Sequence, residues 1–298
     1  MVRMDRRGGI GIGLVLAGIC SVQSGAAVAK LLFDYLDPAA VTWLRLGFAS
    51  LILLAISRPR MRSWDRRTWR AVVLLGVALA GMNLLFYLAA DRIPLALAVT
   101  CELVGPLVLA LALSRRWVDA LWVLLAGAGV AIIGAQSLTG ALDAIGVLLA
   151  IAAGACWAGY IMSSHAVGEL VPGVGGLTAA MCIAAIVTTP FGAVQAVEGV
   201  VAQPWLLLPA LGVAILSSAI AYAFELAALR RIPPRVFGVL MSLEPVAAGV
   251  FALLIVGELI GGIEVVALGI VVAASIGVAL TASRTPPVTP DTAPIVQQ

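Results

Sequence analysis

Ten long apolar runs constrain this chain more than any other feature of its sequence. Each run can cross about 30 Å of hydrocarbon as an α-helix, and the connections between runs are short. A bilayer admits only helices and closed barrels, and these continuous runs lack the alternation of barrel strands. We therefore expect an all-α polytopic membrane protein of ten transmembrane helices. The runs lie at 10–33, 38–57, 70–90, 94–113, 118–136, 142–163, 173–194, 204–229, 234–257 and 262–281.

Composition excludes several classes of protein. The 298 residues are 62% hydrophobic and 11% charged, whereas a soluble domain carries about 25% charged residues. The net charge of +3 does not indicate nucleic-acid binding, because the basic residues lie in short loops between apolar runs. Four cysteines and one histidine lack metal-ligand spacing, so we expect no metal and no cofactor. Without HExxH, GxSxG or P-loop motifs, we expect neither an enzyme nor an ATP-driven pump.

The arginines predict the topology. Alternate loops assign 15 of the 18 basic residues to one side, and only Arg92 to the other. Lys30 and Arg45 lie within or at the edge of the first two helices. The positive-inside rule then places both termini in the cytoplasm of an inner-membrane protein. The Pro- and Thr-rich segment 282–298 is expected to be a disordered cytoplasmic tail.

An internal repeat divides the chain into two five-helix halves, 10–136 and 142–281. Arg92-Ile93-Pro94 reappears 139 residues later as Arg231-Ile232-Pro233, and Pro106 reappears at the same offset as Pro245. Because five is an odd number, the halves cross the membrane in opposite directions. Such inverted repeats are a transporter design with the substrate site near the midplane.

Two acids lie deep in the expected helices. Glu102 is eight residues into the fourth helix and Glu244 about ten into the ninth. A charged acid at that depth costs about 2.5–3.5 kcal/mol, so both are candidates for proton coupling. Pro106 and Pro245 lack an N–H and are expected to break the same two helices near these acids. A neutral glutamic acid that is hydrogen-bonded to the backbone is the structural alternative.

Other polar residues lie within the apolar runs. Lys30 is expected to reach Asp34 or Asp37. Arg45 is assigned to a structural ion pair, and the alternatives are that it stabilises a buried carboxylate or a substrate carboxylate. Glu225 is assigned either to the substrate or to an ion pair or snorkelling near Arg230. Substrate binding, helix packing or, for the aromatic residues, anchoring at the membrane interface accounts for the remaining candidates, which are Gln23, Ser24, Asn83, Tyr87, Trp157, Tyr160 and Tyr222.

Six stretches together resemble the EamA-type branch of the drug/metabolite transporter superfamily, and within it the threonine/homoserine exporters. The resemblance runs from about residue 10 to 281. The stretches are Gln23-Ser24-Gly25-Ala26-Ala27, Gly81-Met82-Asn83-Leu84-Leu85-Phe86-Tyr87-Leu88, Cys101-Glu102-Leu103-Val104-Gly105-Pro106, Ser114-Arg115-Arg116, Gly154-Ala155-Cys156-Trp157 and Met241-Ser242-Leu243-Glu244-Pro245.

The resemblance implies export of small amino acids by proton antiport, with alternating access to a cavity between helices one, three, four, six, eight and nine. The partners that the resemblance implies for the protein are the amino acid, protons and the lipid bilayer. Three alternatives stay open at this point. They are an exporter of other metabolites or drugs, a facilitative metabolite channel, and an intramembrane enzyme whose catalytic pair the sequence does not display.

Overall fold

The computed structural model describes residues 6–59, 61–113, 117–138, 142–221, 224, 227–228, 231–232 and 234–282. These residues form helices and connections, with no strand among them. The elements are α1 (Arg6–Leu32), α2 (Pro38–Ser57), η1 (Met61–Ser63), α3 (Arg66–Arg92), α4 (Leu95–Glu102), α5 (Val104–Leu113), α6 (Trp117–Leu138), α7 (Ala144–Leu170), α8 (Gly175–Ala202), η2 (Pro204–Leu206), α9 (Leu207–Ala214), η3 (Ile215–Ile220), α11 (Pro234–Met241), α12 (Glu244–Phe251), η4 (Ala252–Val256) and α13 (Gly262–Ala282).

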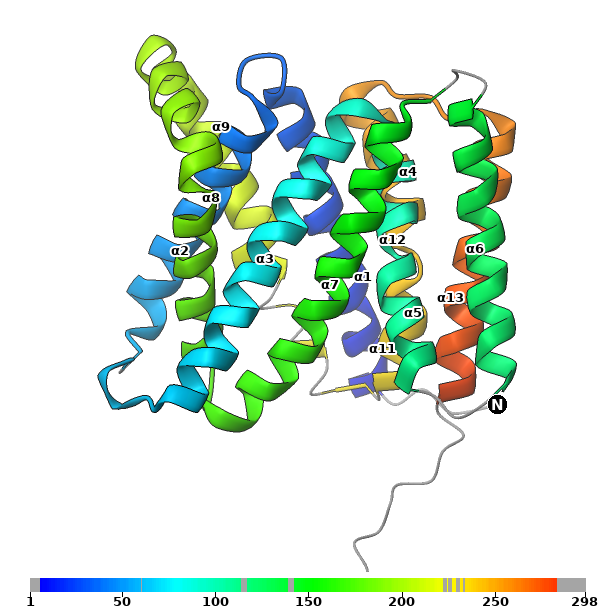
Figure 1. Cartoon of the computed structure of the whole chain (residues 1–298), viewed down its shortest axis with the longest axis horizontal. Helices are drawn as coiled ribbons and strands as arrows, with labels where there is room; N and C mark the ends of the chain where they lie inside the picture. The colour runs from blue at the N-terminus through cyan, green and yellow to red at the C-terminus, as the bar shows by residue number, and fades with distance from the viewer. Residues whose placement is uncertain are drawn as a thin grey trace, which may run out of the picture.

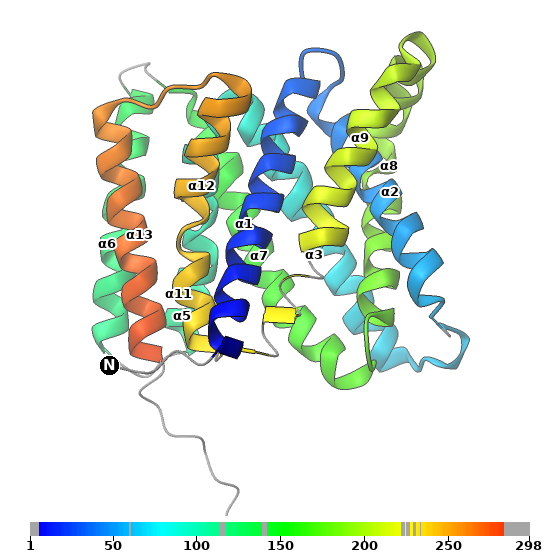
Figure 2. The ribbon, with the colours of Figure 1, turned by 180° about the vertical axis from the view of Figure 1, so that it is seen from behind.

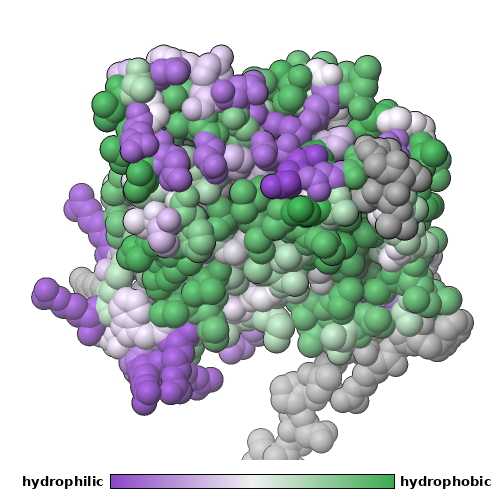
Figure 3. All heavy atoms as spheres, turned by 45° about the horizontal axis from the view of Figure 1, so that its top comes forward, coloured by the Kyte–Doolittle hydropathy of each residue, from purple (hydrophilic) through white to green (hydrophobic). Residues whose placement is uncertain are grey.

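Within the described ranges, nine segments are long and apolar enough to cross a membrane. The eighth run expected from the sequence is represented by the shorter apolar stretch Pro204–Ser218, and part of it lies outside the described residues. Large side chains such as Leu208, Leu254 and Val201 are more than 70% exposed, which suits lipid contact and not water. Figure 3 shows hydrophobic residues over the middle of one face and hydrophilic residues at its margins. The chain is a multi-pass membrane protein.

The helices lie side by side and roughly parallel (Figures 1 and 2). We call the end that carries the 33–37 connection the upper end and the end that carries the 58–65 connection the lower end (Figure 1). Helices α3 and α7 pack together, as do α2 and α8, and α6 and α13. The first described residue of α1 and the last of α13 lie at the lower end (Figures 1 and 2).

Small side chains allow this close packing. The largest buried cluster joins α1, α2, α3, α4 and α7 and consists mostly of alanine, valine and leucine. Gly192 on α8 lies so close to the backbone of Ala39 that no side chain would fit between them. Without a hydrophobic force between helices in lipid, such backbone proximity lets van der Waals contact hold the bundle.

Two of the membrane segments are interrupted near their prolines. Helix α4 ends at Glu102 and α5 begins at Val104, just before Pro106. Helix α11 ends at Met241 and α12 begins at Glu244, directly before Pro245. Each proline lacks an N–H for the carbonyl four residues earlier, so the carbonyls of Glu102 and Met241 lose their usual helical donor.

Several boundaries differ from those expected. Helix α7 continues to Leu170 and α8 to Ala202, well beyond the ends of their apolar runs. On α7 the extension is polar and includes an exposed pair one turn apart, His165 and Glu169, with 3.7 Å between Nδ1 and Oε1. Apolar content predicts that a helix crosses the lipid, but it does not mark the residue at which the helix ends.

Asp143 at the start of α7 gives a pH-dependent prediction. Arg92 and the Ile145 N–H each donate to this carboxylate at 2.8 Å. The hydrogen bond from Arg92, more than the others, lowers the pKa of Asp143. These contacts therefore stabilise the fold above the ordinary pKa of aspartate, and that stabilisation is lost as the pH falls through the lowered pKa.

We expect Asp143→Asn to lower the Tm of the detergent-purified protein slightly at pH 7, because an asparagine keeps the cap but not the charge. The difference from wild type should shrink on acidification. Thermal melts over a pH series measure it. A difference in Tm that is equal at neutral pH and at about pH 3 would contradict the assignment.

Candidate functional site

Arg45 lies in α2, half-buried, among polar groups from two other elements. Its Nη1 donates to the Tyr87 hydroxyl at 3.0 Å, and its Nη2 donates to the Ser217 carbonyl at 3.3 Å. The guanidinium carbon is 5.4 Å from the centre of the Tyr87 ring. None of the ion pairs in the described part of the chain includes Arg45. The structural ion pair expected from the sequence is therefore not formed there.

Tyr87 is fixed from several sides. It is 1% exposed and packs edge-on against Phe33, with the two ring centroids 5.6 Å apart. Phe86 lies against its other side at 5.9 Å. One turn earlier on α3, the buried Asn83 donates through its amide nitrogen to the Leu79 carbonyl at 2.8 Å. Because Tyr87 is held in this way, its hydroxyl can orient the guanidinium of Arg45.

Helix α1 contributes Gln23, which is 3% exposed and whose Oε1 atom has no hydrogen-bond partner. The other candidates of this helix are occupied locally. Ser24 donates to the Ser21 carbonyl at 3.0 Å, and Ser21 donates to the Leu216 carbonyl at 2.7 Å. Among the α1 residues Ser21, Gln23 and Ser24, only Gln23 therefore presents a buried acceptor without a partner.

Glu102 and Glu244 lie in electrostatic range of each other. Glu102 ends α4 and Glu244 begins α12, and these two helices pack together. Glu102 interacts electrostatically with Glu244 and with Arg45. Glu102 thus lies in electrostatic range of a second carboxyl group and of one guanidinium, which come from two other helices.

Backbone contact fixes the interruption at Glu102. The backbones of Gly105 and Gly154 touch so closely that a Cβ atom on either residue would overlap the backbone of the other helix. Cys156 on the same helix α7 also interacts electrostatically with Glu102. Helix α7 therefore packs directly against the backbone at Glu102, and only glycine allows two backbones to come so close.

Lys30 joins three segments near the upper end. It forms an ion pair with Glu258 and donates to the Ile93 carbonyl at 2.9 Å. Glu258 also accepts a hydrogen bond from the Leu95 N–H, at 3.0 Å, and so caps the start of α4. The expected partners Asp34 and Asp37 were wrong for Lys30, because the fold brings a residue 228 positions away nearer to it.

We expect this pair to show energetic coupling. Lys30→Gln or Glu258→Gln alone leaves one charge without its partner where the side chains are only 13% and 19% exposed. Removing one member of a buried pair costs about 3–5 kcal/mol, whereas removing both costs less. Thermal melts of the two single variants and the double variant measure the coupling. Additive losses of Tm would show that the pair contributes nothing.

The other sequence candidates are on α7 or outside the described residues. Trp157 and Tyr160 are half-buried on α7, beyond Gly154, and Tyr160 packs with a cluster from α2, α3 and α8. Tyr222 and Glu225 lie outside the described residues. Sequence reasoning did not list Arg45 or Ser217 in the site. A charged residue within an apolar run was the signal for Arg45, and nothing in the sequence marked Ser217.

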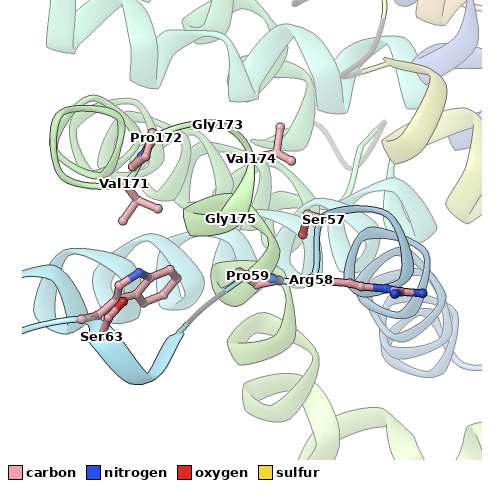
Figure 4. Close-up of a pocket in the computed structure, with 10 residues that line it drawn as sticks. Ser57, Arg58, Pro59, Ser63, Val171, Pro172, Gly173, Val174 and Gly175 are labelled. Atoms are coloured by element: carbon pink, nitrogen blue, oxygen red, sulfur yellow. The ribbon is translucent and has the colours of Figure 1, made fainter.

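A surface pocket of about 470 Å³ lies at the lower end. It is formed by the 57–64 segment after α2 and the 171–175 segment before α8 (Figure 4). Ser57 is twelve residues along α2 from Arg45, which is about 18 Å. This pocket is therefore separate from the polar group around Arg45.

Comparison with known proteins places this arrangement in a family. Residues 144–280 match the EamA-like transporter family. The threonine/homoserine exporter RhtA of Salmonella typhimurium strain LT2 is 41% identical over 275 residues, which is 92% of each chain. This chain belongs to the EamA-like transporter family.

Further relatives of this EamA-like transporter agree. The threonine/homoserine exporter RhtA of Escherichia coli K12 is 40% identical over 91% of this chain and 92% of its own. The uncharacterized transporter YwfM of Bacillus subtilis is 26% identical over 76% of this chain and 79% of its own. One crystal structure at 20% identity has a TM-score of 0.56 over 91% of this chain and 98% of its own, and it shares the fold.

Proposed function

We propose that this protein exports small amino acids, threonine and homoserine among them, across a bacterial inner membrane. The observation that carries the proposal is 40–41% identity to threonine/homoserine exporters over more than nine-tenths of the chain. A half-buried arginine in electrostatic range of Glu102 suits a ligand that carries both charges. No nucleic acid takes part.

Export is coupled to proton antiport through Glu102 and Glu244. Two carboxyl groups in mutual electrostatic range at the ends of interrupted helices favour holding at most one negative charge between them. A proton and the ammonium group of a substrate can each supply the positive charge that such a pair requires. Because the proton and the substrate compete for one site, the protein exchanges one for the other across the membrane.

Transport proceeds by alternating access between two inverted five-helix repeats with ten crossings in all and both termini in the cytoplasm. In this scheme α1, α2, α3, α4–α5 and α6 correspond in order to α7, α8, α9–η3, α11–α12 and α13. If each helix is replaced by its counterpart in the other half, the contact between α3 and α7 becomes a contact between α9–η3 and α1. Both contacts are present. Three further contacts join a helix to its own counterpart, as an inverted repeat requires. They are α2 with α8, α4 of the α4–α5 segment with α12 of the α11–α12 segment, and α6 with α13, and all three occur.

Polar parts of the substrate are bound by Gln23, Asn83 and Tyr87. The unused Oε1 atom of Gln23 and the Tyr87 hydroxyl next to Arg45 support this assignment most strongly. The other proposed contacts are Ser24, Trp157, Tyr160, Tyr222 and Glu225. Pro106 and Pro245 keep their helices interrupted near the two acids.

Efflux from cells tests the proposal. Cells that overproduce the protein are preloaded with labelled threonine or homoserine, and efflux is followed with and without a protonophore. Accelerated efflux against a gradient that stops with the protonophore is expected. Acceleration that the protonophore does not change would indicate a facilitative channel. Efflux equal to that of empty cells, with the protein present in the membrane, would contradict the substrate assignment.

A further inference from the structure

Three buried polar atoms without hydrogen-bond partners lie on α1, α2 and η3. They are Oε1 of Gln23, Nε of Arg45 and Oγ of Ser217, and the Gln23 and Ser217 side chains are only 3% and 4% exposed. Buried polar atoms in proteins are nearly always paired. Atoms that are left unpaired from three separate elements therefore point to a ligand that pairs them.

Arg45 and Ser217 form the part of this group that favours an anion. The Arg45 guanidinium donates to the Ser217 carbonyl at 3.3 Å, so the two residues are in direct contact. Tyr87 accepts from the other terminal nitrogen at 3.0 Å and leaves Nε unused. An arginine N–H and a serine hydroxyl are both able to donate, and a carboxylate has two oxygens to receive them.

Gln23 and Glu102 form the part that favours a cation. Glu258 joins Lys30 on α1 to the first N–H of α4, which places Lys30 and Leu95 at the same depth. Gln23 lies seven residues below Lys30, which is almost two turns, so the two share a face of α1. Glu102 lies seven residues along α4 from Leu95. At 1.5 Å per residue, both lie about 10 Å below the ion pair.

We propose that Arg45 and Ser217 bind the α-carboxylate of the exported amino acid while Gln23 and Glu102 accept its ammonium group. The proposed site combines donors from α2 and η3 with acceptors from α1 and α4, and this combination selects a zwitterion over an amine or an organic anion alone. Tyr87, beside its own proposed contact with the substrate, also holds the guanidinium in place through its hydroxyl. This inference rests on the amino-acid export proposed above. It adds Arg45 and Ser217 as the residues that recognise the substrate carboxylate.

The test compares threonine with threoninamide, which keeps the ammonium group but lacks the carboxylate. Equilibrium dialysis measures the binding of each labelled compound to the detergent-purified full-length protein. Wild type is expected to bind threonine about 10- to 100-fold more tightly than threoninamide. In Arg45→Gln, threonine should fall to the affinity of threoninamide, while threoninamide itself stays within about twofold of wild type.

Two further variants keep the test decisive. Arg45→Lys retains the charge and should recover part of the preference for threonine, even if the glutamine variant is poorly folded. Arg92→Gln removes an arginine from an exposed ion pair whose side chains are 43% and 34% exposed. That control should bind both compounds as wild type does.

Equal loss of both compounds in Arg45→Gln, from a protein that elutes as a single species, would overturn the carboxylate assignment and make Arg45 structural. Equal affinity of wild type for threonine and threoninamide would overturn it as well. In both cases export of threonine could still be observed, and the proposed function would stand. Failure of wild type to bind or export threonine at all would instead overturn the proposed function and this inference together.

Discussion

Glu102→Gln is expected to lower uphill export of threonine strongly while the protein still inserts and folds. Glutamine keeps the shape of the side chain but cannot take up and release a proton. Because Glu102 interacts with both Glu244 and Arg45, its loss also leaves the arginine without an opposing carboxyl group. Export against a gradient should fall roughly 10- to 100-fold, and the remaining transport should no longer depend on pH.

Glu244→Gln should give the same defect, because the two acids act on one ion. Glu169→Gln is the matched control, since this glutamate is on α7 with a side chain that is 66% exposed. It should export as wild type does. Efflux assays at several pH values, normalised to the amount of protein in the membrane, provide the measurement. Normal export with an unchanged pH dependence in both Glu102→Gln and Glu244→Gln would refute the coupling assignment.

Gly154→Ala is expected to destabilise the protein strongly. The added methyl group would overlap the carbonyl of Glu102, which belongs to the backbone and cannot swing aside. Overpacking of this kind costs about 3 kcal/mol, which corresponds to roughly 6–12 °C in Tm. The displaced backbone would also carry Glu102 away from Glu244 and Arg45, so export should fall with stability.

Gly159→Ala is the control on the same helix. An added methyl group there meets only the Ala78 Cβ, at an ordinary 3.8 Å. Alanine favours the helix by up to about 1 kcal/mol over glycine, so this variant should melt at or slightly above the wild-type temperature. Thermal melts of both variants in the same detergent make the comparison. A Gly154→Ala protein as stable as Gly159→Ala would contradict the close contact between α7 and the end of α4.

Much of the fold follows from local sequence. Lipid requires about 20 apolar residues for each crossing, so the runs themselves predict nine of the membrane segments found among the described residues. The prolines at 106 and 245 predict interruptions because a missing N–H is a local property. The ends of α7 and α8 were less predictable, since a helix continues past its most apolar run and hydropathy does not mark its last residue.

Partners within the bundle could not be predicted in the same way. Lys30 has two aspartates a short distance along the chain, yet it pairs with Glu258. Arg45 was assigned to an ion pair, yet it bonds to a tyrosine and to a serine carbonyl. These choices depend on which helices become neighbours, and that depends on glycines such as Gly105 and Gly154 that let backbones touch. The interruption beside Glu102 was predictable from Pro106, whereas the sequence did not show which carboxyl group Arg45 would approach.

Purified protein in lipid vesicles tests proton-coupled amino-acid exchange most directly. Vesicles with an acidic interior are placed in a more alkaline buffer that contains labelled threonine, and uptake is followed over time. If protons that leave the vesicle drive threonine inward, threonine will accumulate above its external concentration, and a protonophore will release it. Threonine that reaches only the external concentration, with or without the pH gradient, would contradict antiport and show a facilitative pathway instead.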